Sequence, residues 1–210
     1  MSITVIFFLG FFVALIGIIP PGLLNMTAAR ISLKEDAGRG ITFSSGVCII
    51  VFVQTYLAAI FARYLSNRSD IVEILQRVAF VIFVLITIYF LVIASKQKEK
   101  KIEGDDIRSK KSRMFHGMLL SALNVFPIPY QAYMTITLAS FGWMNFEKTS
   151  IITYVTGAAM GTFVMLYFYI FFFDKIKDKK FTSQKSMNFS IGIITGLVSL
   201  ITFINILREL

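Results

Sequence analysis

Residues 18–25 read IIPPGLLN and stand inside a run without charged side chains that extends over residues 2–29. A charge-free apolar run of this length predicts a helix that crosses a membrane. Pro20, Pro21 and Gly22 are, however, the residue types that a helix interior tolerates least. The sequence therefore predicts that the first membrane helix is broken within the bilayer, which raises the question of what the break does.

The rest of the chain has the composition of a membrane protein. Of its 210 residues 56% are hydrophobic, including 22 Phe, which is too apolar for a soluble domain of this size. The charged residues leave six charge-free runs: 2–29, 40–62, 78–95, 114–146, 149–173 and 186–207. Because about 20 apolar residues cross the hydrocarbon core, the runs predict an all-α integral membrane protein with six transmembrane helices.

Lys and Arg residues are distributed unequally over the connections between these runs. The first, third and fifth connections carry 16 of the 21 Lys and Arg residues. The positive-inside rule places these connections in the cytoplasm, so both termini are predicted to face outward. Attraction of the basic loops to an anionic leaflet accounts for the net charge of +9 without a nucleic-acid partner.

The basic linker 96–113 divides the chain into two membrane repeats of three helices each, residues 1–95 and 114–210. Because three is an odd number, the second repeat is inverted relative to the first. The chain has four prolines, all in the first helix of a repeat: Pro20, Pro21, Pro127 and Pro129. Gly46 and Gly157 also correspond. This pattern predicts two inverted three-helix repeats with broken first and fourth helices.

A proline inside a helix removes one donor and frees the carbonyl four residues earlier, at a cost of about 3 kcal/mol. The carbonyls expected to be free are those of Ile16, Gly17, Leu123 and Val125. Free carbonyls cannot face lipid, so both breaks are expected to lie against protein or a wet cavity. A simple proline kink is the structural alternative, but two double breaks at matched positions favour a functional break.

Uncharged polar side chains gather around the two breaks. In hydrocarbon a buried amide without a partner is costly, so these groups are expected to meet one another, freed backbone or a solute. Hydrogen bonding between helices is the alternative for each of them. The candidate substrate-binding residues are those of the breaks and their polar neighbours: Pro20, Pro21, Gly22, Asn25, Gln54, Asn124, Pro127, Pro129, Tyr130 and Gln131.

None of the six runs contains Asp, Glu, Lys or Arg, the residues that usually mark proton relays and metal sites in membranes. His116, the only histidine, lies near the start of the fourth run, where an interfacial role is more common than proton transfer. The sequence also lacks a nucleophile–base pair, a zinc motif and a phosphate loop. It therefore predicts solute passage without catalysis, metal or cofactor, and half-helix ends can hold a zwitterion.

The first two helices resemble the opening of the LysE/RhtB superfamily of amino-acid exporters. Those proteins carry a Pro-Gly-Pro motif in the first helix, a glycine at the start of the second helix, and another glycine six residues on. Pro21 and Gly22 match the first two positions of the motif, and Gly40 and Gly46 have the expected separation. Leu23 stands where the second proline of the motif would be.

The fourth helix carries the second part of the resemblance. Residues 121–124, SALN, resemble the lead-in to the family's Asn-Pro-Lys motif, whereas residues 125–129, VFPIP, displace its proline and lack its lysine. The resemblance implies export of amino acids or similar small metabolites from a bacterial cytoplasm across the inner membrane. A passive small-solute pore and a membrane scaffold or biogenesis factor remain alternatives. The sequence does not identify the solute or the coupling ion, and it does not decide whether the protein forms a homo-oligomer.

Overall fold

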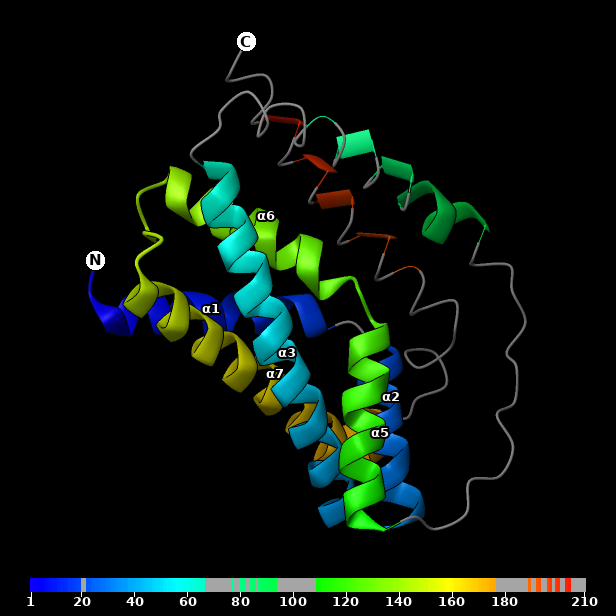
Figure 1. Ribbon diagram of the computed structural model, residues 1–210. Coiled ribbons are helices and arrows are strands. Elements are labelled where there is room, and N and C mark those ends of the chain that lie inside the picture. The colour runs from blue at the N-terminus through cyan, green and yellow to red at the C-terminus, as the bar shows by residue number, and fades with distance from the viewer. Residues whose placement is uncertain are drawn as a thin grey trace. The chain divides into compact units, whose positions relative to one another are not determined.

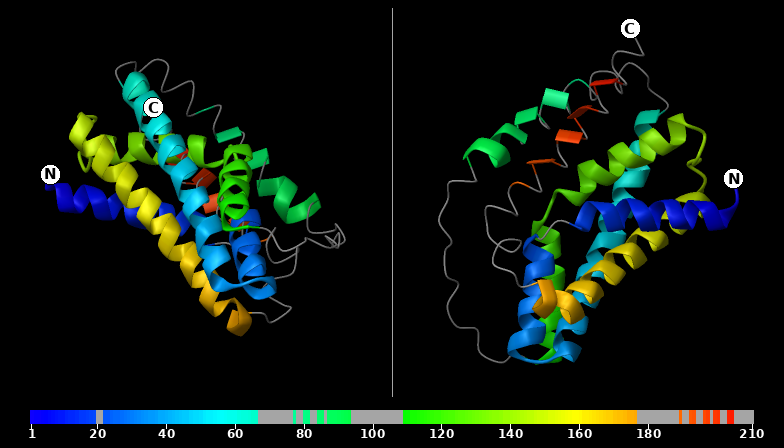
Figure 2. Two further views of the ribbon diagram at one scale, coloured as in Figure 1. Left: turned by 60° about the horizontal axis from the view of Figure 1, so that its bottom comes forward. Right: turned by 180° about the vertical axis from the view of Figure 1, so that it is seen from behind.

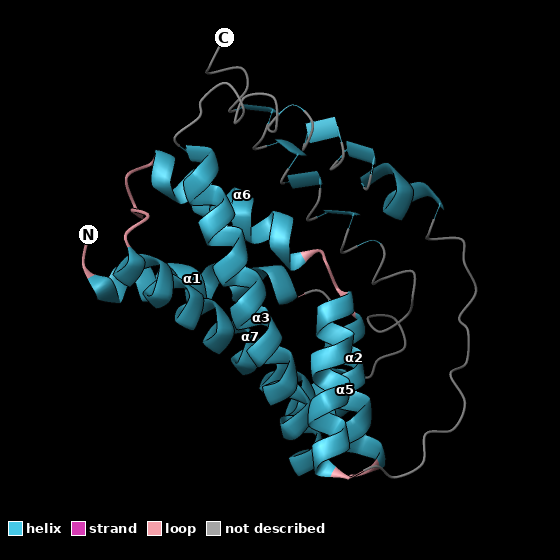
Figure 3. Ribbon diagram, in the orientation of Figure 1, coloured by secondary structure: helices cyan, strands magenta, loops and turns pink. Residues whose placement is uncertain are grey.

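The computed structural model of the chain describes residues 1–19, 22–66, 77, 80–81, 84–85, 87–93, 109–176, 189, 192–193, 196–197, 199–200 and 203–204. In that part of the chain every regular element is a helix, which confirms the all-α prediction there (Figures 1 and 3). The elements are α1 (Ile3–Ile18), α2 (Leu23–Lys34), α3 (Ala37–Ser66), the π-helix η1 (Tyr89–Ile93), α5 (Lys110–Leu123), α6 (Pro127–Ser140) and α7 (Lys148–Ile176).

The contacts divide the chain into two units. The first unit comprises residues 1–64 and 105–174, and the second comprises residues 65–104 and 175–210. The first unit contains α1, α2, α5 and α6 together with nearly all of α3 and α7, and the second contains η1. The division of the sequence into two repeats joined by a basic linker stays a prediction.

Within the described residues, two helices are long and apolar enough to cross a membrane by themselves, namely α3 and residues Lys148–Phe172 of α7. The pair α1 and α2 meets the same criteria only as one broken span, with a bend of 79° between its two parts. Helices α5 and α6 divide the fourth run in a similar way. The third and sixth runs lie largely outside the described residues, so the count of six spans stays a prediction.

Glycines allow α1 and α7 to approach each other closely. A Cβ atom on Gly10 of α1 would overlap the carbonyl oxygen of Tyr154 of α7, and one on Gly157 of α7 would overlap that of Phe7. Small residues at such contacts are typical of helix packing in membranes, where apolar burial alone does not drive association. The first and fifth predicted spans therefore pack directly on each other.

The pair formed by α3 and α5 repeats this contact. Gly46 of α3 faces the carbonyl oxygen of Met114 of α5, and Gly117 of α5 faces that of Phe43. In each of the four helices the contacted carbonyl precedes the glycine by three residues. The reciprocal contact of the first and fifth spans thus has a counterpart in the second and fourth spans.

Two apolar cores fill the two ends of the first unit, and each surrounds one of the short helices that follow a break. One core packs Leu24 of α2 with residues of α3 and α7 such as Leu166. The other packs Leu138 of α6 with residues of α1 and α7 such as Tyr154. Helices α2 and α6 therefore occupy opposite ends of this unit (Figures 1 and 2).

The described flanks of the basic connections meet at the end of the first unit that contains α2. Helix α2 lies beside α5 there (Figure 2). A Cβ atom on Gly38 would lie 3.6 Å from Nζ of Lys110, and one on Gly40 would lie 3.3 Å from Cδ1 of Ile170. We call this the basic end, because it gathers the connection after α2, the start of α5 and the later part of α7.

In the second unit, described residues of the third and sixth runs contact each other. The rings of Phe80 and Phe203 stack with their centroids 5.6 Å apart, and a Cβ atom on Gly192 would overlap the side chain of Leu91. Phe80 therefore contacts the later residue of the sixth run and Leu91 the earlier one, so the two stretches run in opposite directions. An apolar pocket of about 340 Å³ lies between them and contains none of the candidate site residues.

Candidate functional site: two broken helices

The first break separates α1 from α2. Helix α1 ends at Ile18 with Ile19 as its cap, and α2 begins at Leu23 after an extended Gly22 with φ −118° and ψ −179°. Gly22 has no side chain with which to cap the first backbone N–H groups of α2, which lie at the positive end of the helix dipole. Pro20 and Pro21 lie outside the described residues.

Two side chains hold the carbonyl groups at the end of α1. Nδ2 of Asn25 donates to the carbonyl oxygen of Ile18 at 2.6 Å. The hydroxyl of Tyr169, which comes from α7, donates to the carbonyl oxygen of Ile19 at 2.8 Å. The last carbonyls of a helix have no intrahelical donor, so these two bonds provide the partners that a lipid environment cannot.

The second break separates α5 from α6. Helix α5 ends at Leu123, Asn124 is extended with φ −84° and ψ 92°, and Pro127 and Pro129 lie in the first turn of α6. Backbone N–H groups in a first turn have no intrahelical acceptor, so a proline there costs no helix bond. The cost of about 3 kcal/mol for an interior proline therefore does not apply to these two residues.

Gln54 of α3 holds the end of α5. Its Nε2 donates to the carbonyl oxygen of Ser121 at 3.2 Å and to that of Asn124 at 3.0 Å. The hydroxyl of Ser121 in turn donates to the carbonyl oxygen of Val47 on α3 at 3.4 Å. At both breaks, then, a polar side chain of the long helix packed on the broken one donates to the chain where the first half-helix ends.

The expected set of free carbonyls was wrong in two places. The carbonyl oxygen of Ile16 accepts from the backbone N–H of Ile19 at 3.4 Å, and that of Val125 accepts from the N–H of Ile128 at 3.1 Å. Helix α1 ends two residues before Pro20, and α5 ends four residues before Pro127. The carbonyls that need outside donors are therefore those at the helix ends.

Tyr130, in the first turns of α6, brings the second break close to the first. Its hydroxyl donates to the carbonyl oxygen of Val13 on α1 at 2.9 Å, and a Cβ atom on Gly17 would lie 2.8 Å from its Cε1. The next residue, Gln131, accepts a hydrogen bond from the hydroxyl of Tyr154 on α7 at 2.7 Å. The start of α6 thus lies against the end of α1.

Two buried polar atoms near the second break have no hydrogen-bond partner among the described residues. They are Oε1 of Gln54 and Oγ1 of Thr55. The side chain of Thr55 is fully buried, and Gln54 is 6% exposed. An unsatisfied acceptor in such a place costs free energy, so each atom has the capacity for a hydrogen bond that the described residues do not supply.

The sequence identified the breaks but missed the residues that reach them from other helices. Tyr154, Tyr169 and Thr55 lie within long charge-free runs, where a hydroxyl is a weak signal because it also occurs at lipid interfaces. No proline or glycine break adjoins any of these residues in the sequence, so nothing there indicates that its hydroxyl lies at a helix break. Their roles depend on contacts with residues far away in the sequence.

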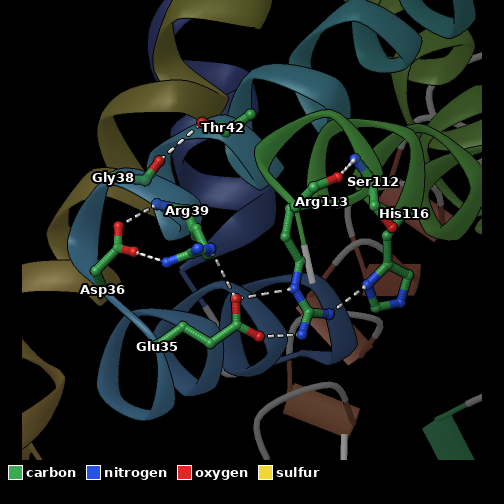
Figure 4. A network of polar contacts seen from close by, with 9 residues as sticks. Glu35, Asp36, Gly38, Arg39, Thr42, Ser112, Arg113 and His116 are labelled. Atoms are coloured by element: carbon green, nitrogen blue, oxygen red, sulfur yellow. Dashed lines mark hydrogen bonds and ion pairs between the residues drawn. The ribbon is translucent and has the colours of Figure 1, made fainter. Parts of the chain in front are cut away.

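An ion-pair cluster at the basic end was also missed (Figure 4). Glu35, which follows α2, pairs with Arg113 of α5 through both carboxylate oxygens, and the two side chains are 4% and 1% exposed. Arg113 directly precedes a charge-free run, and the sequence places it in the basic linker 96–113. Nη1 of Arg113 also lies 3.3 Å from Nδ1 of His116, so the histidine packs within this cluster.

A second, more exposed pair completes the cluster. Arg39 pairs with Asp36, and its Nε lies 3.5 Å from Oε2 of Glu35. The backbone N–H of Arg39 donates to the carboxylate of Asp36 at 2.8 Å, which lowers the pKa of that carboxyl. Within the described residues, no group of three or more His, Cys, Asp or Glu side chains could hold a metal ion.

Comparison with known proteins identifies the family. The family model described as LysE type translocator matches residues 15–204, which include both breaks and the ion-pair cluster. Curated proteins and solved structures gave no match. The match confirms the resemblance seen in the sequence, and proteins of this family are transporters and not enzymes. The chain, with its apolar helices and two helix breaks, belongs to the LysE type translocator family of membrane transporters.

Proposed function

We propose that this transporter exports amino acids or similar small metabolites through one site formed by its two helix breaks. The observation that supports the proposal most is the position of Tyr130, which follows the second break and bonds to α1 just before the first. Facing breaks can share one polar cavity, whereas separate breaks would each need their own partners in the bilayer. The ten candidate residues predicted from sequence remain our proposal for this site.

The two half-helix starts differ in what they can bind. Helix α2 begins after Gly22 and keeps its first N–H donors, so its positive end suits the carboxylate of an amino acid. Helix α6 has lost two donors to Pro127 and Pro129 and suits an anion less well. The acceptors Gln54 Oε1 and Thr55 Oγ1 suit the ammonium group, near the negative end of the α5 dipole.

The directions of the helices support the proposed inverted repeat with six spans. Helices α3 and α5 run the same way, since their contacts progress from Gly46 and Met114 to Gln54 and Asn124. We infer that the chain returns to the other side of the membrane between residues 66 and 110, since the third run is long enough to cross it. The opposite directions of the third and sixth runs agree with this topology.

We place the basic end in the cytoplasm of a bacterial cell, since Lys and Arg are retained on that side of the inner membrane. The structure of the first unit supports one part of this proposal, because the flanks of the basic connections meet at one end. Both termini would then face outward. Export follows if the solute enters from this end.

Amino-acid excretion tests the proposal. We expect cells that express the protein to accumulate one or a few amino acids in the medium and to tolerate a toxic analogue or dipeptide that raises the internal pool. Gln54→Met should reduce excretion at least tenfold. Ser45→Ala is the matched control, because Ser45 lies on the same helix and its hydroxyl donates to the carbonyl oxygen of Ile41 on that helix.

Purified protein in liposomes separates export from the alternatives. A carrier shows saturable counterflow of the excreted amino acid, whereas a passive pore shows flux without counterflow. If no proteinogenic amino acid or common analogue is excreted at verified expression, amino-acid export is wrong. If Gln54→Met and Ser45→Ala reduce excretion equally, the proposed site is rejected but amino-acid export is not.

A further inference from the structure

The Glu35–Arg113 pair connects two helices that belong to different repeats. Glu35 is the first residue after α2, and Arg113 lies in the first turn of α5. Both charges are almost completely buried, although each lies at a helix end where a small displacement would return it to water. Because desolvation offsets most of the attraction in a buried ion pair, the paired and the separated, hydrated states can have similar free energies.

Helix α2 has the features of an element that moves as a unit. It begins at the break, where Gly22 is extended and the chain is not helical, and hinges are typically a few residues at an element's end. Ala28 and Ile31 of α2 are buried in the core at the basic end. Outward movement of α2 would therefore open a path from the basic end to the breaks.

The opposite end of the first unit is closed in a different way. There α6 occupies the place that α2 has at the basic end, and the connection after it packs Met144 against Ile6 and Ile151. Apolar contacts of this kind lose free energy when water enters. A charged closure at one end and an apolar closure at the other allow the two ends to open independently.

We propose that α2 is the gate at the basic end and that the Glu35–Arg113 pair is the latch that holds it closed. This proposal rests on the proposed transport function, since a gate serves a solute path. Arg39, in the first turn of α3, pairs with Asp36 and lies 3.5 Å from Oε2 of Glu35, and its side chain is 27% exposed. The latch itself is the buried pair that joins α2 to α5.

Thiol accessibility in nanodiscs tests the latch without a solute. In a Cys48→Ser background, Ala28→Cys places a thiol on the buried face of α2, and Ala59→Cys places one in the core at the opposite end; both alanines are fully buried. We expect Arg113→Gln to increase the rate of labelling at position 28 by a water-soluble maleimide at least tenfold. Labelling at position 59 should change less than twofold.

The control variant is Lys34→Gln, which removes an exposed charge next to Glu35 at the end of α2 but leaves the buried pair, and it should change both rates less than twofold. An unchanged rate at position 28 in folded Arg113→Gln protein would overturn the latch. So would equal increases at both positions, which indicate general loosening. Glu35→Gln should repeat the effect, and failure of both variants to fold would show that the pair is structural. If the wild-type protein excretes no amino acid but the labelling rates change as expected, only the proposed function is rejected and the latch is retained.

Discussion

The clearest prediction concerns Gln54, whose side chain joins α3 to the end of α5. Gln54→Met keeps the length of the side chain and removes its two donated bonds, to Ser121 at 3.2 Å and to Asn124 at 3.0 Å. Hydrogen bonds between membrane helices contribute about 0.6 kcal/mol on average and at most about 1.7 kcal/mol. Loss of two such bonds should therefore lower the free energy of unfolding by about 1–3 kcal/mol.

Thermal unfolding in detergent measures this effect. A destabilisation of 1 kcal/mol lowers Tm by about 3 °C in a chain of this size, so Gln54→Met should unfold about 3–9 °C below the wild type. Cys48 is the only cysteine and is partly buried, so a thiol-reactive fluorophore reports its exposure on unfolding. The second break should loosen while the contacts of α1 with α7 persist.

Thr55→Val is the matched control for this prediction. Thr55 is the next residue on the same helix and is equally buried, but its hydroxyl has no partner among the described residues. Replacing an unsatisfied hydroxyl with a methyl group is neutral or stabilising, so Tm should stay constant or rise. The reasoning would be refuted if Gln54→Met left Tm unchanged, or if Thr55→Val lowered Tm as much as Gln54→Met did.

Three further predictions address packing, the breaks and topology. Gly46→Val should destabilise the protein by about 1–3 kcal/mol or prevent its accumulation, since a Cβ atom there overlaps the backbone of α5; normal expression and Tm would contradict close packing. Pro127→Ala with Pro129→Ala should lower stability by only about 1–2 kcal/mol and should reduce excretion more than tenfold, so unimpaired excretion would speak against a functional break. In a Cys48→Ser background, a cysteine within 96–113 should resist an impermeant thiol reagent in intact cells and one at Leu210 should react; the reverse pattern would invert the orientation.

The positions of the breaks could be predicted from the sequence because proline and glycine act locally. The charge-free runs located the helices, and α1 and α5 end at Ile18 and Leu123, each two to four residues before its proline pair. Two of the expected free carbonyls were misplaced, because those of Ile16 and Val125 accept from the backbone N–H groups of Ile19 and Ile128. Local rules therefore predict where the helices end, but they do not predict which carbonyl groups lack a backbone donor.

The contacts that hold the breaks together could not be predicted from one sequence. Tyr169 is separated from Ile19 by most of the chain, and Gln54 from Asn124 by a third of it. No spacing rule connects such residues, because the connection depends on how helices from different repeats pack. The burial of Arg113, at the end of the basic linker, could not be predicted for the same reason, since Arg113 is buried by its pairing with Glu35 after α2.

The central claim is that the two breaks form one solute site, and paired-cysteine crosslinking between positions 25 and 124 tests it most directly. The pair is introduced as Asn25→Cys with Asn124→Cys in a Cys48→Ser background and treated with bifunctional thiol reagents of graded length in nanodiscs. The account predicts that short reagents join the two positions. Failure of every reagent to join them in folded protein would contradict a shared site.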